Sequence, residues 1–396
     1  MRDILVANKI VKKCKGLKAI PCISFLFILL FSACKSDDTD LPIDNEVQGN
    51  VTFLFTAGSE LDTRTTLNSS DNLQHVEKVF LYVFSGTGDR ASYVQTREIP
   101  WPAPGDVGYL TTSRSFTVSL GPGAYTFLAI GSDDNSGTTY NLPGAITAGT
   151  TLSAAKAILA SGKTKTDIAR SELFAGYAVV SDVEANGSTT VPVKLWRRVA
   201  GVIGWFKNIP YKLPFLSTGT QVKKMTIELY TNQNKTIALK KAASNDYGEN
   251  PFVANENAMN NKIILEYDLS GYMQAAGKNY YDVTAVNANN QLQAGSYILP
   301  VKAPDLVSGG TLILRYYDET GTEISGTSRI IQLQSSTPNG GGTTILNTAV
   351  FSLEANQLYG MGTKDVPVDL DPGTGDDIVI TVNPMWEGIS DDIPLE

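Results

Sequence analysis

The sequence predicts a mostly β protein with two tandem β-sandwich domains and one or two short helices. Short runs rich in Val, Ile, Thr, Phe and Tyr recur along the chain, and Gly, Asn and Asp separate them. This is the pattern of sandwich strands joined by turns. Charged residues make up only 18% of the 396 residues, whereas the chain holds 35 Gly and 17 Tyr. Such a composition is typical of extracellular β-rich chains.

The first 33 residues have the pattern of a lipoprotein signal peptide and are set aside before the fold is considered. A cluster of five lysines is followed by an apolar run, Ala19–Phe31. The run is shorter than the about 20 apolar residues that a membrane-spanning helix needs. It ends in Ser32-Ala33-Cys34, small residues before a cysteine, where a lipoprotein signal peptidase cuts. The usual motif has Leu where this chain has Phe31.

We therefore expect cleavage before Cys34, with diacylglycerol on its thiol and palmitate among the acyl chains. The other two cysteines, Cys14 and Cys22, leave with the signal peptide. The mature chain then has no disulfide and no thiol for metal binding or catalysis. Two other interpretations stay open: an ordinary secretory signal with a chance cysteine, and an uncleaved membrane anchor, which Pro21 and Ser24 disfavour by interrupting the apolar run.

The charge of the mature chain excludes one class of partner. Removal of the signal takes six of the 32 basic and one of the 40 acidic residues, which leaves a net charge of −13. An acidic chain is a poor partner for nucleic acid. Its surface is not drawn to anionic lipid either, so attachment to the outer membrane depends on the acyl chains, of which two or more hold stably.

The mature length is sufficient for two domains. Residues 34–50 are polar and acidic and predict a flexible tether between lipid and first domain. We expect an N-terminal β-sandwich over residues 51–198 and a C-terminal β-sandwich over residues 199–396. The boundary is placed near Arg198, because Val191–Ile203 has the pattern of a strand that leaves one domain and enters the next.

Two strand predictions stand out. Val51–Thr56 is rich in β-branched and aromatic residues and predicts the first strand. Val76–Phe84 is apolar on both faces, which predicts a central, buried strand. Further strands are predicted at Ser115–Leu120, Ala124–Ile130, Phe174–Asp182, Thr189–Phe206, Met225–Tyr230, Lys262–Tyr267, Ser296–Val301, Thr311–Tyr317, Ile330–Leu333, Gln357–Gly362 and Ile378–Trp386.

The clear helix candidate in the first half of the chain is Leu152–Ala160. Leu152, Ala155 and Ile158 share one face of a helix, and Gly162 follows as a C-terminal stop.

No motif predicts an enzyme, a metal site or a cofactor. The single histidine, His75, cannot build a catalytic triad or a multi-histidine metal site by itself. Two acidic turns, Asp133–Asn135 and Asp371–Asp377, do not follow the spacing of a calcium loop. The sequence also holds no phosphate-binding loop, dinucleotide-binding fingerprint or serine-hydrolase elbow.

Four features, in this order along the chain, resemble the fimbrillin family, the lipoprotein-derived type V pilins of anaerobic Gram-negative bacteria with their anchor and tip subunits. The first is Cys34 with the acidic tether behind it. The second is a strand followed by a loop with an arginine, Asp62-Thr63-Arg64-Thr65-Thr66. The third is the V-x-K-V-x-L-Y-V-F strand at Val76–Phe84. The fourth, Leu195–Ala200, is similar to an L-x-R-x-x-A run near the family's domain junction. The resemblance implies sandwiches of transthyretin-like, Greek-key topology.

The resemblance also implies a mechanism. In these pilins a trypsin-like protease cuts after an arginine behind the first strand, and the lipid and that strand are lost. A strand from a neighbouring subunit then fills the groove by β-augmentation. In this chain the cut would fall between Arg64 and Thr65 and would remove Val51–Ala57. The candidate donor is residues 377–386, in which one apolar row is formed by Ile378, Ile380 and Val382.

The implied function is a structural subunit of a cell-surface fimbria that mediates adhesion. Its partners would be other fimbrial subunits and ligands on host or bacterial surfaces. An alternative within the family is an anchor subunit, which keeps the lipid on Cys34 and its first strand. A different class is a surface glycan-binding lipoprotein, which would need exposed aromatic platforms; Trp101 is the candidate, although packing of its loop is the favoured role.

Overall fold

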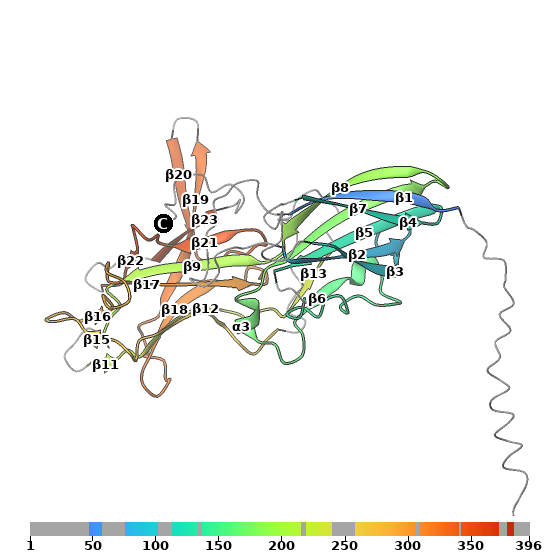
Figure 1. Cartoon of the computed structure of the whole chain (residues 1–396). Helices are drawn as coiled ribbons and strands as arrows, with labels where there is room; N and C mark the ends of the chain where they lie inside the picture. The colour runs from blue at the N-terminus through green and yellow to red at the C-terminus, as the bar shows by residue number, and fades with distance from the viewer. Residues whose placement is uncertain are drawn as a thin grey trace, which may run out of the picture. The chain divides into compact units, whose positions relative to one another are not determined.

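The computed structural model describes residues 47–57, 76–101, 113–133, 137–214, 219–239, 258–305, 309–339, 342–371 and 378–383 (Figure 1). Most of these residues lie in β-strands, which confirms the mostly β sandwich fold. None of the helices in these ranges is long and apolar enough to cross a membrane.

The N-terminal half forms one sheet that folds over on itself. Its strand order is β3-β2-β5-β7-β8-β1-β4. β8 pairs with β1 over most of its length and with β7 only at its last two residues, so it passes from one layer to the other. The strands are β1 (Gly49–Ala57), β2 (Lys78–Ser85), β3 (Ser92–Ile99), β4 (Ser113–Leu120), β5 (Gly123–Ser132), β7 (Leu173–Val183) and β8 (Ser188–Arg197).

A shared apolar core holds the two layers together. Buried side chains of β1, β4 and β8 pack against buried side chains of β2, β5 and β7. The predicted central strand is confirmed: six consecutive residues of β2, Val79–Phe84, are buried, because one face packs on this core and the other on a second cluster.

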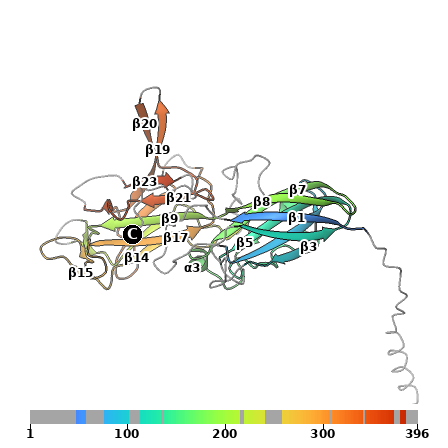
Figure 2. The same cartoon turned by 45° about the horizontal axis from the view of Figure 1, so that its top comes forward.

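The C-terminal half forms a second sheet of order β14-β12-β18-β19-β23-β21-β9-β17. Its strands are β9 (Ala200–Lys207), β12 (Lys224–Leu229), β14 (Ile263–Asp268), β17 (Gln291–Ile298), β18 (Leu312–Tyr317), β19 (Arg329–Asn339), β21 (Leu358–Met361) and β23 (Ile378–Asn383), with β20 (Gly342–Thr348) added to β19 and β22 (Val368–Asp369) to β9. Beyond the other strands, β19 and β20 continue as a two-stranded ribbon (Figures 1 and 2).

This second sheet also closes over a core. One apolar cluster collects buried residues from β9, β12, β14, β18 and β21. The Tyr267 hydroxyl on β14 donates to the Gly204 carbonyl on β9 at 3.0 Å. A side chain at Gly204 would come within 2.8 Å of that hydroxyl, so the close approach of the two strands requires glycine at this position. Two short ribbons complete the half: β10 (Lys212–Leu213) with β11 (Thr220–Gln221), and β15 (Met273–Gln274) with β16 (Tyr281–Asp282).

The chain changes sheet between Arg197, the end of β8, and Ala200, the start of β9. The predicted boundary at Arg198 falls on this step. The halves are nevertheless joined by a small ribbon, in which β6 (Lys156–Ile158) pairs antiparallel with β13 (Thr236–Ala238). A third apolar cluster contains residues from both halves, Tyr82 and Leu173 from the first and Ile203 and Leu299 from the second among them.

The helix predicted at Leu152–Ala160 is wrong. Only Leu152–Ala154 is helical, as a 3-10 turn, and the following residues form β6. Leu152, Ala155 and Ala157 are all buried, so the apolar spacing is satisfied by a turn followed by a strand. Beyond the 3-10 turn, the backbone bonds to β13 and the residues that flank it: the Leu239 amide donates to the Ala155 carbonyl at 3.1 Å, and the Leu159 amide donates to the Lys235 carbonyl at 2.8 Å.

The α-helix of this region, α3 (Lys165–Ile168), lies a few residues later. Thr164 and Asp167 form a capping box: the Asp167 carboxylate accepts from the Thr164 amide at 2.8 Å. Sequence reasoning missed this helix, although the T-x-x-D spacing at these positions is a capping-box pattern.

Buried tyrosines predict a steep alkaline transition. Burial raises the pKa of Tyr281 to about 12 and raises the pKa values of Tyr82, Tyr267, Tyr316 and Tyr359 further. A tyrosine hydroxyl has a pKa of about 10 in the unfolded chain. Because folding raises that pKa, the protonated hydroxyl contributes fully to the stability of the fold below about pH 10. The contribution is lost as the pH rises through the higher pKa of the folded state. We expect phenolate absorbance to appear for these residues together with loss of circular dichroism at or above pH 12. Independent titration of all tyrosines near 10 in the folded protein would contradict the burial.

Candidate functional site

The first strand of the chain lies inside its layer rather than at an edge. β1 pairs antiparallel with β4, with Gly49 opposite Leu120 and Thr56 opposite Ser113. On its other side it pairs parallel with β8, with Asn50 opposite Ser188. Both backbone edges of β1 are therefore used, and we call the place between β4 and β8 that Gly49–Ala57 occupies the β1 slot (Figure 1).

Apolar side chains fill the inner side of the β1 slot. Val51, Phe53 and Phe55 are 0% exposed. The Phe53 ring meets the Phe127 ring edge-on at 4.7 Å between centroids and stacks with the Phe55 ring at 5.6 Å. Each such buried side chain contributes about 1.5–3 kcal/mol relative to exposure, so the strand is held by a large apolar contact.

The outer side of β1 is polar and open to solvent. The Thr52 and Thr117 hydroxyls lie 2.9 Å apart across the β1–β4 pair. The Ser119 hydroxyl donates to the Asn50 side-chain oxygen at 2.7 Å. Leu54 is 45% exposed. The alternation of inner and outer residues is that of a strand with one buried face.

The N-terminal end of the β1 slot is closed. A Cβ atom on Gly49 would lie 2.3 Å from the Glu184 carbonyl oxygen and 2.7 Å from a Val183 methyl, which leaves no room for a side chain. The turn between β7 and β8 fixes the backbone here: the Asn50 amide donates to the Gly187 carbonyl at 2.9 Å, and the Asn186 amide to the Gln48 carbonyl at 3.2 Å.

The predicted donor segment is a strand of the second sheet. β23 pairs parallel with β19, Ile378 lying opposite Ile331, and antiparallel with β21, Asn383 lying opposite Leu358. Like β1, it has one parallel and one antiparallel neighbour. The described part of the segment ends at Asn383.

Sequence reasoning missed a buried ion pair where the chain changes sheet. The Glu172 carboxylate at the start of β7 is 0% exposed and accepts from the Arg197 guanidinium at the end of β8. Tyr297 of β17, in the second sheet, lies beside this pair: burial first, and then the Glu172 charge, raise the pKa of the Tyr297 hydroxyl far above its usual range. The neighbouring Arg198 is also buried and donates to the Ala238 carbonyl of β13 at 2.8 Å.

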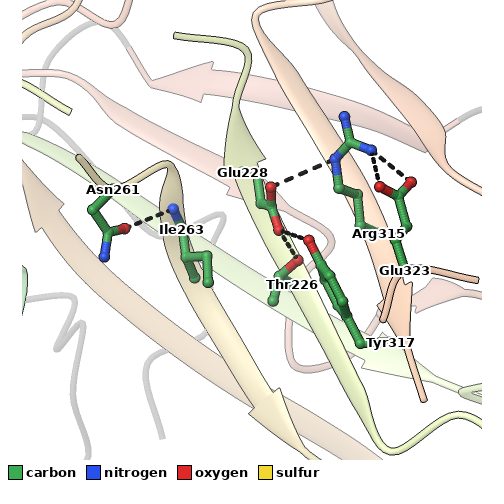
Figure 3. A network of polar contacts seen from close by, with 7 residues as sticks. All are labelled: Thr226, Glu228, Asn261, Ile263, Arg315, Tyr317 and Glu323. Atoms are coloured by element: carbon green, nitrogen blue, oxygen red, sulfur yellow. Dashed lines mark hydrogen bonds and ion pairs between the residues drawn. The ribbon is translucent and has the colours of Figure 1, made fainter. Parts of the chain in front are cut away.

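A second polar network ties strands of the C-terminal sheet together (Figure 3). Glu228 of β12 is 6% exposed and accepts from Thr226 at 2.7 Å and from the Tyr317 hydroxyl of β18. Arg315 of β18 joins it at 3.5 Å and donates to both carboxylate oxygens of Glu323 at 2.5 Å. The two carboxylates share the Arg315 guanidinium, so the network links β12, β18 and the residues that follow β18.

Several predicted site residues lie outside the described residues. These are the lipidation site Cys34, the processing site Arg64 and Thr65, and His75. Their predictions are therefore untested, and the backbone of β23 alone places Ile378, Ile380 and Val382.

The acidic turns and Trp101 have ordinary structural surroundings where they are described. Asp133 accepts from the Ser171 hydroxyl at 2.9 Å, and within the part of the chain that the structure describes no group of three or more His, Cys, Asp or Glu could hold a metal ion. Trp101 packs against the core under β1, with the Arg114 guanidinium 5.9 Å from its ring centre. A half-buried Trp in this position fits the loop-packing role.

The chain belongs to the family of fimbrillin-A associated anchor proteins Mfa1 and Mfa2, whose family model matches residues 41–391. It is thus a structural protein of cell-surface fimbriae that assembles with other fimbrial subunits, and the family is not one of enzymes. The resemblance to fimbrillins is confirmed.

Solved structures that are similar to this chain come from Parabacteroides and Porphyromonas. A candidate cell adhesion protein from Parabacteroides distasonis aligns with a TM-score of 0.43 at 10% identity, covering 87% of this chain and 99% of that one. The fimbrilin of Porphyromonas gingivalis aligns at 0.39 with 14% identity over 86% and 98%. The tip fimbrial protein Mfa3 of the same organism aligns at 0.38 with 13% identity over 84% and 98%. No curated protein matches the chain in sequence.

Proposed function

We propose that this chain is exported as a lipoprotein on Cys34 and joins an adhesive fimbria by exchange of its first strand. The observation that carries the proposal is the position of β1. It is the strand nearest the lipidation site, yet it lies in the interior of its layer and pairs along both edges. Everything that attaches the lipid to the folded protein passes through β1.

Arg64 is in the right place for a processing switch. It lies in the one chain segment that connects β1 to β2, residues 58–77. A cut after Arg64 leaves β1 and the lipid held by noncovalent contacts alone. Loss of β1 then bares two unpaired strand edges, β4 and β8, and the apolar surface beneath Val51, Phe53 and Phe55.

An empty β1 slot is too costly to persist. The three buried side chains together contribute about 5–9 kcal/mol, which is comparable to the whole stability of a typical domain, about 5–15 kcal/mol. A strand from a neighbouring subunit restores both the backbone bonds and the apolar contact. In turn this chain offers residues 377–386 to its neighbour, with Ile378, Ile380 and Val382 as the apolar row.

An anchor role is the second candidate, and the tight packing of β1 favours it. The strand is paired over nine residues and its inner side chains are fully buried, which suits a strand that stays. In that case Arg64 is not cut, the lipid on Cys34 is kept in the outer membrane, and the chain ends the fibre. The family's description as anchor proteins fits this candidate. The glycan-binding alternative lacks a comparable observation, because Trp101 is packed.

The test of cleavage is assembly on the cell. We expect Arg64→Ala to leave export intact but to keep the subunit out of fimbriae, with Arg90→Ala as a control change of an exposed arginine between β2 and β3. Deletion of residues 377–396 should block addition of the next subunit while the chain is still exported. Wild-type incorporation of the Arg64→Ala chain would refute the cleavage step, and wild-type assembly of the deletion would refute the donor.

One measurement separates subunit from anchor. N-terminal sequencing of the chain recovered from the cell surface should give Thr65 for a processed subunit. A blocked, lipid-bearing Cys34 identifies the anchor.

A further inference from the structure

We infer that the β1 slot selects its occupant, and that it accepts β1 while rejecting the C-terminal strand of a second copy of this chain. This inference rests on the proposed strand exchange and narrows its partner. It follows from the shape of the slot at two places: its closed end at Gly49 and its two aromatic positions.

The closed end sets the register of any occupant. A side chain at the Gly49 position would meet the Glu184 carbonyl at 2.3 Å and Val183 at 2.7 Å. The first contact is with backbone, which cannot turn aside as a flexible side chain can. An occupant must therefore place glycine there or leave the slot before that point, so it cannot slide further toward the turn between β7 and β8.

The aromatic positions set the size of the inner row. Phe53 and Phe55 are fully buried, and Phe53 packs on Phe127 from β5, whose ring also lies 6.2 Å from that of Tyr125. Protein cores are close-packed, so a smaller side chain in either position leaves a void that the rigid neighbours do not fill. The slot therefore fits a strand with the inner side chains Val-x-Phe-x-Phe, or with inner side chains of the same volume.

The C-terminal strand meets neither demand. With Ile378 in the Val51 position, Ile380 and Val382 replace the two phenylalanines and leave both positions underfilled. In this register Asp376 arrives at the Gly49 position, where there is no room for a side chain. Moving the strand by two residues places Asp376 in the buried Val51 position, where an unpaired carboxylate is strongly disfavoured.

The consequence is that copies of this chain do not polymerise with one another. The slot keeps the chain's own β1 or takes a strand of similar inner volume from an unlike subunit, and residues 377–386 serve a different subunit whose slot has smaller inner positions. A subunit that does not bind copies of itself lies at one end of a fibre built from other subunits, which agrees with the anchor candidate.

The test is a competition for the slot. A specific protease site is placed within residues 58–72 of the full mature chain, the chain is cut, unfolded in urea, and refolded with two labelled peptides, residues 49–57 and residues 377–385. We expect the β1 peptide to be taken up at least about 30-fold in preference, a factor that corresponds to about 2 kcal/mol. Equal uptake, or preference for residues 377–385, would overturn the inference.

Matched peptides locate the selectivity. The β1 peptide with Phe53→Ile and Phe55→Val should compete as weakly as residues 377–385, whereas Leu54→Ala, an outer position of the same strand, should compete like the parent. A peptide with Gly49→Ala should bind no better than one that begins at Val51. If the doubly substituted peptide matched the parent, the aromatic positions would not be selective.

A separate arm tests the exchange itself. The cut chain is incubated with labelled β1 peptide without urea, and uptake is followed over time. No uptake here, with clear selectivity after refolding, counts against spontaneous strand exchange and leaves the slot's selectivity standing. Uptake without urea, together with no preference between the peptides after refolding, supports strand exchange and counts against the selectivity of the slot.

Discussion

Phe53→Ala should lower the free energy of unfolding by about 3–5 kcal/mol, the cost of removing a buried aromatic ring and leaving a cavity. Phe53 is fully buried at the centre of the β1 slot, where its ring contacts Phe127 and Phe55. The neighbouring layer is fixed by backbone pairing on both sides, so it has little freedom to collapse into the space. Urea unfolding of the full mature chain, followed by circular dichroism, measures the change.

The matched control is Leu54→Ala on the same strand. Leu54 is 45% exposed on the outer side, so its truncation should change stability by no more than about 0.5 kcal/mol. A loss for Phe53→Ala that is no larger than the loss for Leu54→Ala would mean that β1 does not contribute its inner row to the core.

The Phe53 result also bears on assembly. If β1 contributes several kilocalories per mole, a chain cut at Arg64 holds its first strand firmly until a competing strand arrives. Exchange then depends on how well the competitor fills the inner positions, because the backbone bonds are the same for any strand. A weakened β1 should be displaced more easily, so Phe53→Ala is expected to speed the loss of the cut strand.

The sequence was most informative where a strand has a strong pattern. The doubly apolar run at Val76–Phe84 could only be a strand buried on both faces, and β2 is that strand. β3, Ser92–Ile99, was missed because Arg97 and Glu98 interrupt its alternation, as suits a strand at the edge of the sheet order. β20 was missed although Asn339-Gly340 is a hairpin signal that could have revealed it.

The helix at Leu152–Ala160 failed for a different reason. Its spacing of apolar residues fits both a helix and a turn followed by a strand, and local sequence cannot decide between them. The decision is made by β13, some eighty residues later, which supplies the backbone partners of β6. Pairing between distant segments overrides a weak local preference.

The candidate site also depends on pairing between segments that are distant in sequence. Composition and alternation identify β1 as a strand and Arg64 as a basic residue behind it. They do not reveal that β1 lies between β4 and β8, since those partners are about 65 and 140 residues away in sequence. The closed end at Gly49 is invisible in the sequence as well, because it is created by a carbonyl of the turn that follows β7.

The pair between Glu172 and Arg197 gives the second large prediction. Glu172→Gln should lower the free energy of unfolding by about 3–5 kcal/mol, because it removes the buried carboxylate charge that pairs with the Arg197 guanidinium. Glu172 is 0% exposed and the Arg197 side chain only 11%, so water cannot replace the lost partner. Calorimetry of the full mature chain measures the change.

Two further variants show whether charge or packing is responsible. Replacing both partners, Glu172→Met with Arg197→Met, should recover most of the loss, since a buried pair exchanged for apolar side chains of similar volume is often neutral. Glu98→Gln breaks the exposed pair with Lys78 and should cost less than about 1 kcal/mol. Equal losses for Glu172→Gln and Glu98→Gln would show that the junction pair is not energetically buried.

The location of the pair adds a second readout. Glu172 lies just before β7 and Arg197 at the end of β8, opposite the turn that joins these two strands, and Tyr297 beside them belongs to the second sheet. The two sheets share this polar contact together with the β6–β13 ribbon and an apolar cluster. Loss of the pair should therefore weaken the coupling between the sheets. We expect the single heat-absorption peak of the wild type to broaden or split in Glu172→Gln. In Phe53→Ala the peak should stay single, because the effect of that substitution lies within one sheet. Splitting in both variants would place the weak link elsewhere than at this junction.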